Sequence, residues 1–179
     1  GGITKSKGEK ALEYMNLIKT RGAKIKGDFS NIDEVAKAMA GYVANGGAYF
    51  NYSYGCEMYS ENSCRASGVA MTQIVQPDKL DSTVKSGDFA IISGEHSDIK
   101  ENYDVAQALK SRGVKVIYIG PASTEGSSGK DVTKIADWHI ETYSPEREGA
   151  LTVPGFEKKI CPTTGILYAL ALWMTNAQF

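Results

Sequence analysis

Short apolar runs alternate with helix-like apolar spacing along most of the chain. Continuous apolar runs predict buried strands over residues 89–93 and 114–119, and a shorter run predicts a strand over 48–52. Around these runs, apolar residues recur three and four positions apart in 30–45 and 99–112, which is the spacing of a helix with one buried face. The chain therefore alternates between strands and helices.

The same pattern continues, more weakly, in the rest of the chain. The remaining predicted elements are a helix over 7–27, a helix over 56–66, a short strand over 138–140 and a helix over 163–177. We interpret residues 1–29 as an N-terminal accessory helix and residues 30–179 as one α/β domain.

Alternating strands and helices need crossover connections, which place the strands parallel and the helices on the faces of the sheet. The sequence thus predicts a three-layer, doubly wound, flavodoxin-like parallel sheet flanked by helices. Ligands of such sheets bind beyond the carboxyl ends of the strands, so the turns after residues 52, 93 and 120 are the places to search.

The amino-acid composition limits the classes of binding partner and the cellular location that we expect. Lys and Arg total 20 against 21 Asp and Glu, which argues against nucleic acid or an anionic membrane surface. No apolar run reaches the length of a membrane span. The three cysteines are too few and too widely spaced for a disulfide framework or a metal site; they are Cys56, Cys64 and Cys161. We therefore expect free, packing thiols, which suit the reducing cytoplasm. The Gly1 start leaves a removed leader open.

Small polar residues gather in the turns beyond the predicted strands and before the last helix. Hydroxyl groups and the free backbone N–H groups of helix N-termini favour anions such as phosphate. The residues predicted to hold an anion are Ser53, Gly55, Ser93, Ser97, Thr163 and Thr164. The alternative is that Ser53, Ser97 and Thr163 only cap helices.

Several segments, in order, resemble the sugar isomerase (SIS) domain family, closest to an uncharacterised subgroup that is like phosphosugar and phosphoheptose isomerases. The resemblance covers residues 30–179. The segments that carry it are Gly46–Gly47 with the following strand and turn, 61–68, 91–94, 110–114, 136–137, 145–151 and 161–165.

The resemblance implies a protein that binds a sugar phosphate, uses no cofactor and has aldose–ketose isomerisation as a candidate activity. It also implies a homodimer or homotetramer, for which the apolar helix around Leu172–Met174 is a candidate interface.

Isomerisation needs a base that removes a proton beside the carbonyl group and an acid that returns one. Glu61, on the helix behind the first turn, is the candidate base, and His96, in the second turn, is the candidate acid. Alternatively, Glu61 is a surface carboxylate or a partner of Arg65, and His96 is a turn residue without chemistry. His139 fits a structural role.

Two turns depart from the family's pattern. Tyr52 and Tyr54 are bulky where a backbone must approach phosphate, and Glu95 would repel a dianion. These departures favour an alternative function, a non-catalytic ligand-sensing or scaffold module with a degenerate phosphate site. A third interpretation is an interaction protein that uses an exposed patch of Tyr49, Tyr52, Tyr54 and Tyr59.

Overall fold

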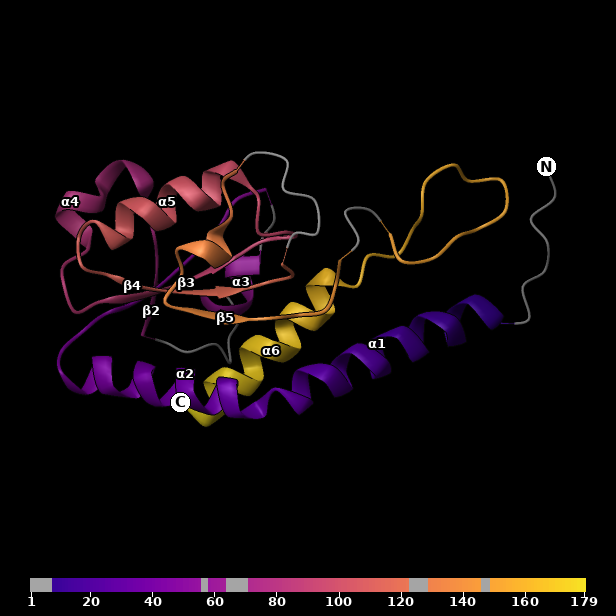
Figure 1. The fold of residues 1–179 in the computed structure, drawn as a ribbon, viewed down its shortest axis with the longest axis horizontal. Coiled ribbons are helices and arrows are strands. Elements are labelled where there is room, and N and C mark those ends of the chain that lie inside the picture. The colour runs from indigo at the N-terminus through magenta and orange to yellow at the C-terminus, as the bar shows by residue number, and fades with distance from the viewer. Residues whose placement is uncertain (1–7, 56–57, 64–70, 123–128, 146–148) are drawn as a thin grey trace.

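A five-stranded parallel sheet organises the chain (Figure 1). The computed structural model describes residues 8–55, 58–63, 71–122, 129–145 and 149–179. The strands are β1 (Tyr49–Ser53), β2 (Thr72–Ile74), β3 (Phe89–Ser93), β4 (Lys115–Ile119) and β5 (Trp138–Ile140). Their spatial order is β2-β1-β3-β4-β5, so the chain reverses its direction of travel across the sheet between β2 and β3. The switch point, where ligands of such folds bind, therefore lies between β1 and β3.

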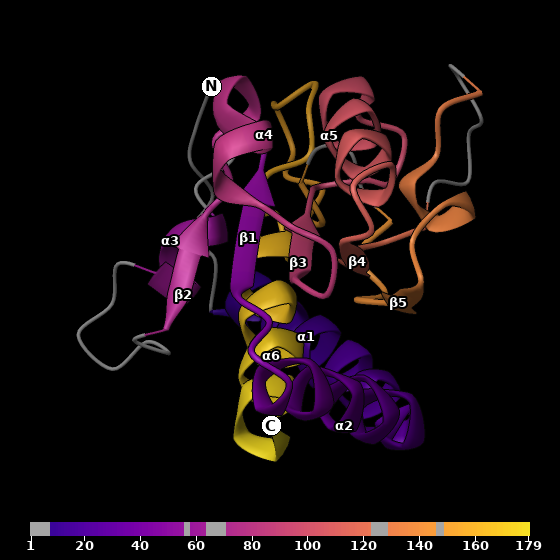
Figure 2. The same ribbon diagram turned by 90° about the vertical axis from the view of Figure 1, so that its left-hand side faces the viewer.

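Helices cover both faces of the sheet. The α-helices are α1 (Glu9–Gly27), α2 (Phe29–Ala44), α3 (Met58–Ser63), α4 (Leu80–Thr83), α5 (Lys100–Lys110) and α6 (Thr164–Gln178), with short 3-10 turns at Pro77–Lys79 and Val132–Lys134. Figure 2 shows α4 and α5 on one face of the sheet and α2 and α6 on the other, with α1 beyond α6. In the described part of the chain, no helix is both long and apolar enough to cross a membrane.

Two hydrophobic layers form because successive strand residues point to opposite faces. On β3, Phe89 and Ile91 pack among the side chains of α2 and α6, whereas Ala90 and Ile92 pack against α5. All five residues of β3 are buried, as expected of a central strand covered on both faces. The predicted α/β architecture is confirmed.

Most predicted elements lie within one or two residues of the observed ones, but β2 and α4 were not predicted. β2 is an edge strand of three residues, and two of them, Gln73 and Ile74, are exposed, so it carries no apolar run. The division into an accessory segment and a domain stays a prediction. The predicted helix over 56–66 is described only for Met58–Ser63, and its far end lies outside the described residues.

Candidate functional site

The carboxyl ends of β1 and β3 bring two of the predicted residues together. Ser53 and Ser93 are the last residues of these strands and pair directly in the parallel register. Ser93 is 1% exposed and Ser53 8% exposed, so neither is open to solvent. Gly55 follows in the exposed turn with a φ of 75°, a conformation that favours glycine. The switch point is thus closely packed rather than a wide, hydroxyl-lined crevice.

Asn102, on the first turns of α5, ties the two turns at the switch point together. Its Nδ2 donates to the backbone oxygen of Ser93 at 3.0 Å, and its Oδ1 accepts from the backbone N–H of Tyr54 at 3.1 Å. Gly94 makes room for this amide, because a Cβ there would lie 2.6 Å from Asn102 Nδ2. One buried side chain therefore fixes the spacing between the turns after β1 and β3.

The N-terminus of α6 carries a buried cluster of hydroxyl groups. Ser144 Oγ lies 2.8 Å from Thr163 Oγ1 and 3.0 Å from Thr164 Oγ1. Arg21, from α1, donates from Nη1 to Thr163 Oγ1 at 2.7 Å. Thr163 occupies the N-cap position of α6 but makes no side-chain capping bond. Its hydroxyl group instead connects α1, the segment after β5 and α6.

A cleft of about 430 Å³ opens between α3, the turn after β3 and the first turns of α6. It is lined by Met58, Glu61, Glu95, Pro162, Thr164, Gly165, Ile166, Tyr168 and Ala169. Glu61 and Glu95 supply two carboxylates from different elements, and Thr164 supplies a hydroxyl group from α6. Among the described lining residues there is no Lys or Arg. The cleft thus combines proton-transfer groups with the positive end of a helix dipole.

A buried network of hydrogen bonds holds α3, and with it Glu61, in place. Asn62 Nδ2 donates to the hydroxyl of Tyr49 on β1 at 2.7 Å, and Asn62 Oδ1 accepts from Nδ2 of Asn176 on α6 at 2.9 Å. The Tyr49 hydroxyl also lies 3.2 Å from Asn176 Oδ1. Burial raises the pKa of Tyr49 well above its ordinary value, so this hydroxyl stays protonated and can donate. Three elements around the cleft are thereby joined.

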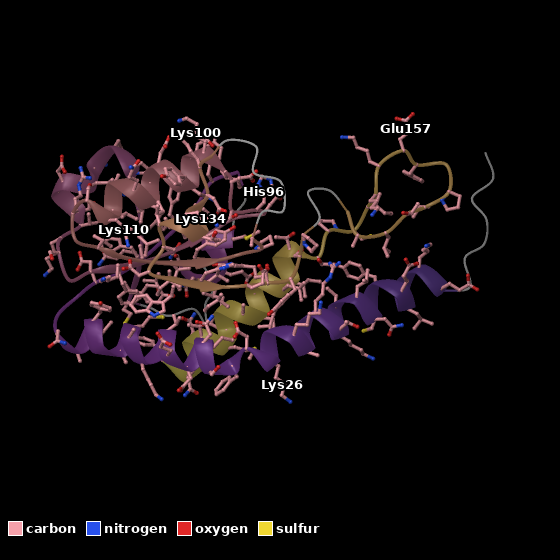
Figure 3. All side chains as sticks on the ribbon, in the orientation of Figure 1. Lys26, His96, Lys100, Lys110, Lys134 and Glu157 are labelled. Atoms are coloured by element: carbon pink, nitrogen blue, oxygen red, sulfur yellow. The ribbon has the colours of Figure 1, made fainter. Side chains whose placement is uncertain are left out.

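His96 lies beside the cleft but is engaged with a neighbour. Its Nδ1 is 2.7 Å from Asp98 Oδ1, and the Asp98 side chain is almost fully buried. Figure 3 shows His96 beyond the sheet, at the edge that carries this turn. The next residue, Ser97, is fully buried, and its backbone oxygen accepts from Val132 N–H at 2.9 Å. These contacts fix the second turn.

The side chain of Ser97 reaches Asp131 on the opposite loop. Burial alone would raise the pKa of Asp131, but hydrogen bonds from Thr133 and from the Ser97 side chain hold it below its ordinary value. The Ser97 hydroxyl therefore bonds a carboxylate of the protein itself, which is a structural contact.

The structure separates the predicted site residues into two groups. Glu61 and Thr164 line the cleft, whereas Ser93, Ser97 and Thr163 are buried and are not among its lining residues. Sequence reasoning missed Asn102 and Arg21, and considered Glu95 only as a repelling charge. A polar residue at Asn102, on the otherwise apolar face of a helix, was the one available signal for the first of these.

Three other expectations can be compared with the structure. Leu172, in the candidate interface helix, is fully buried in the chain's own core, whereas Trp173 and Met174 are half-buried, and the helix as an interface stays a prediction. Cys161 is exposed rather than a packing thiol, and Cys56 and Cys64 lie outside the described residues. His139 Nε2 donates to the Gly120 backbone oxygen at 2.9 Å, a structural contact.

The tyrosines around β1 do not form one exposed patch. Tyr49 is buried in the core, Tyr52 is half-buried and Tyr54 is 48% exposed. The side chain of Tyr59 and the proposed partner Arg65 lie outside the described part of the chain. The interpretation as an aromatic interaction surface therefore loses its main support.

Comparison with solved structures identifies the fold. The structure of a putative sugar-phosphate isomerase from Listeria monocytogenes superposes with a TM-score of 0.52 at 13% identity, over 99% of this chain and 89% of that one. A "putative phosphosugar isomerase" from Clostridium difficile superposes with a TM-score of 0.54 at 9% identity, over 92% of this chain and 45% of that one. The chain thus has a sugar isomerase-like α/β fold, and it spans less than half of the second relative.

Sequence comparisons add no closer relative. No protein-family model matches the chain, and no curated protein does.

Proposed function

We propose that the chain binds a sugar phosphate in the cleft beside α6 and interconverts its aldose and ketose forms. The observation that carries this proposal is the position of Glu61, which lines the same cleft as the N-terminus of α6. A carboxylate for proton transfer and a site for an anion are thereby combined in one ligand-sized space. The fold shared with the putative sugar-phosphate isomerase from Listeria monocytogenes supports this assignment by analogy.

The phosphate group would lie at the first turn of α6. A helix of 15 residues presents unbonded N–H groups and a partial positive charge there, and Thr164 and Gly165 belong to that turn. A Cβ at Gly165 would meet nothing within 4 Å, so its backbone is open to a ligand. Arg21, at Thr163 Oγ1, adds a positive charge behind this turn. This end of the cleft is therefore the one suited to an anion.

The sugar would extend towards the carboxylates. In the reaction, Glu61 takes the proton from the carbon beside the carbonyl group. The C–H bonding electrons form a carbon–carbon double bond, and the π electrons of the carbonyl group move onto its oxygen, which gives an enediolate. The protonated Glu61 exchanges its proton with solvent and then delivers a proton to the neighbouring carbon, which completes the exchange of aldose and ketose. A second proton must move between the two oxygens, and Glu95, in the cleft, or His96, beside it, are the groups placed for that transfer.

A thermal-shift screen against sugar phosphates, free sugars and inorganic phosphate tests binding. A ligand at 100 times its dissociation constant stabilises the folded chain by about 2.7 kcal/mol. Gly165→Leu places a side chain in the cleft and should abolish the shift. Gly41→Leu is the matched control, since Gly41 is a helical glycine with equally open space but lies on α2. A shift that survives Gly165→Leu would place the ligand elsewhere.

A second candidate function is ligand sensing without turnover. It is favoured by the two carboxylates of the cleft and by the burial of Ser97 and Thr163, whose hydroxyl groups are engaged within the protein. A ligand that shifts the melting temperature but is not converted at any enzyme concentration would favour this function over isomerisation.

A further inference from the structure

A second cavity lies along α1, apart from the cleft beside α6. It measures about 420 Å³, and the described residues that line it are Glu13, Asn16, Leu17, Thr20, Arg21 and Lys24. Their positions recur at intervals of three and four, so they lie along one side of the helix. The cavity shares no described lining residue with the cleft. We call it the α1 groove.

Contacts with the rest of the chain hold α1 in place. The Tyr14 hydroxyl donates to the backbone oxygen of Pro162 at 2.8 Å, and Arg21 Nη1 donates to Thr163 Oγ1 at 2.7 Å. Ile25, one turn after Arg21, is fully buried in the core. The side chains of the α1 groove are therefore carried by a helix that is fixed at several points along its length.

The charged groups of the α1 groove are divided between its two ends. At one end, Glu13 forms an ion pair with Lys10 at 2.6 Å, so its charge is compensated. At the other end are Arg21 and Lys24, which are three positions apart and therefore neighbours on the helix surface. Lys24 Nζ lies 5.4 Å from the centroid of the Tyr143 ring, and within the described part of the chain it forms no ion pair. This end of the groove is therefore basic.

Two uncharged polar side chains line the groove between these ends. Asn16 and Thr20 are exposed, and neither side chain makes a hydrogen bond within the described residues. An amide and a hydroxyl group can both donate and accept, whereas Arg and Lys only donate. A ligand-sized cavity with cations at one end and such groups beside them suits a small molecule that carries an anionic group and hydroxyl groups.

Arg21 connects the α1 groove to the cleft beside α6. Its Nη1 bonds Thr163 Oγ1, which lies 2.8 Å from Ser144 Oγ, and Ser144 Oγ lies 3.0 Å from Thr164 Oγ1. Thr163 and Ser144 are fully buried, and Thr164 is 5% exposed and lines the cleft. A continuous set of hydrogen bonds thus runs from a side chain of the groove to a side chain of the cleft.

We propose that the α1 groove is a second ligand site, which takes a small phosphate monoester, and that Arg21 transmits its occupancy to the first turn of α6. The phosphate group lies at Arg21 and Lys24, because a guanidinium and an ammonium group side by side can share its oxygens. The rest of the ligand extends past Thr20 and Asn16. That the first turn of α6 holds a substrate rests on the proposed function, whereas the groove and its link to this turn do not.

Nuclear magnetic resonance with inorganic phosphate as the probe tests the groove without a sugar. The titration uses Gly165→Leu, which blocks the cleft and should fold, since a Cβ there meets nothing within 4 Å. Ionic strength is kept constant with chloride, because salt screens surface charges. The backbone amides of Asn16, Thr20 and Lys24 should shift together and saturate. Shifts that do not saturate, or that chloride alone reproduces, overturn the site.

Glycerol 3-phosphate tests the class of ligand in the same variant. Its hydroxyl groups can reach Thr20 and Asn16, so it should bind about fivefold more tightly than inorganic phosphate, as one additional hydrogen bond would give. The side-chain amide of Asn16 should then shift further than it does with inorganic phosphate. Equal affinities of the two probes would overturn the assignment of a monoester.

A charge variant separates the groove from the general basic character of α1. Lys24→Glu, in the Gly165→Leu background, reverses a charge of the groove and should weaken phosphate binding by about tenfold. Lys26→Glu is the matched control, since it makes the same change of charge but Lys26 does not line the groove, and Figure 3 shows it pointing away from the sheet. Both positions are exposed, and the dispersion of the spectra checks that the variants fold. Equal weakening in the two variants would overturn the site.

The same titration tests the link to α6. Ser144 and Thr164 are not among the described lining residues of the groove, so their amides report on Arg21 rather than on contact with the probe. They should shift with the same apparent dissociation constant as the groove amides, and lose this response in Lys24→Glu. Groove shifts that leave both amides unchanged would overturn the link. A chain that binds phosphate in the groove but no sugar phosphate in the cleft would refute the proposed function alone.

Discussion

Replacing Asn102 should destabilise the fold more than its single amide suggests. The side chain is fully buried and bonds two backbone groups from different turns, Tyr54 N–H and the Ser93 oxygen. Asn102→Ala leaves both groups without a partner in the protein interior, at a cost of about 1–3 kcal/mol each. We therefore expect the free energy of unfolding to fall by about 3–4 kcal/mol.

Urea denaturation followed by circular dichroism measures this change. With an m-value of about 2 kcal/mol per molar, the midpoint should fall by between about 1.5 and 2 M. Asn102→Leu, which keeps a side chain branched at Cγ but not the hydrogen bonds, should lose at least as much. The control is Asn45→Ala, which removes one exposed hydrogen bond to the Gly41 backbone oxygen. If Asn102→Ala and Asn45→Ala differ by less than about 0.5 kcal/mol, the bridge between the turns does not hold the switch point together.

Two further predictions concern stability. Gly47→Ala should unfold at a clearly lower urea concentration than wild type, because an added Cβ would lie 2.3 Å from the Gly87 backbone oxygen. Gly41→Ala, in open space on α2, should instead stabilise the chain by about 0.5–1 kcal/mol. Equal effects of the two substitutions on the urea midpoint would contradict the packing described. Burial opposes ionisation of Asp137, but the Val116 N–H and two lysines hold its pKa below the ordinary value. The contribution of this carboxylate to the free energy of unfolding is therefore present above about pH 4 and is lost as the pH falls through the lowered pKa. Asp137→Asn should therefore lose less stability than wild type between pH 5 and pH 2 in urea titrations, while a steeper loss would refute this assignment.

The parts of the fold that could be predicted are those with a strong local pattern. β3 was predicted to the residue because its first four residues are apolar, all five are buried between helices on both faces, and the apolar run stops at Ser93. β2 gave no such pattern, since Thr72, Gln73 and Ile74 form an edge strand and are largely exposed. Its existence depends on pairing with β1, which no local sequence pattern encodes.

The candidate site was predictable only where position along the chain implied position in space. Glu61 follows the first strand, and that connection places it at the switch point. The cleft itself depends on α6, which meets α3 only in the folded chain, across about a hundred residues of sequence. The burial of Ser97 and the bond from Arg21 to Thr163 also arise from tertiary contacts, and no spacing in the sequence indicates them.

Proton exchange at the carbon beside the carbonyl group tests the central claim most directly. Each sugar phosphate that shifts the melting temperature would be incubated with the protein in deuterated water and followed by nuclear magnetic resonance. The account predicts interconversion of aldose and ketose with deuterium at that carbon, slowed by about a hundred- to ten-thousandfold in Glu61→Gln. Glu157→Gln, on the exposed segment before Cys161, should exchange as wild type does. Undiminished exchange in Glu61→Gln, or no exchange with any ligand that binds, would contradict the assignment of Glu61 as the catalytic base.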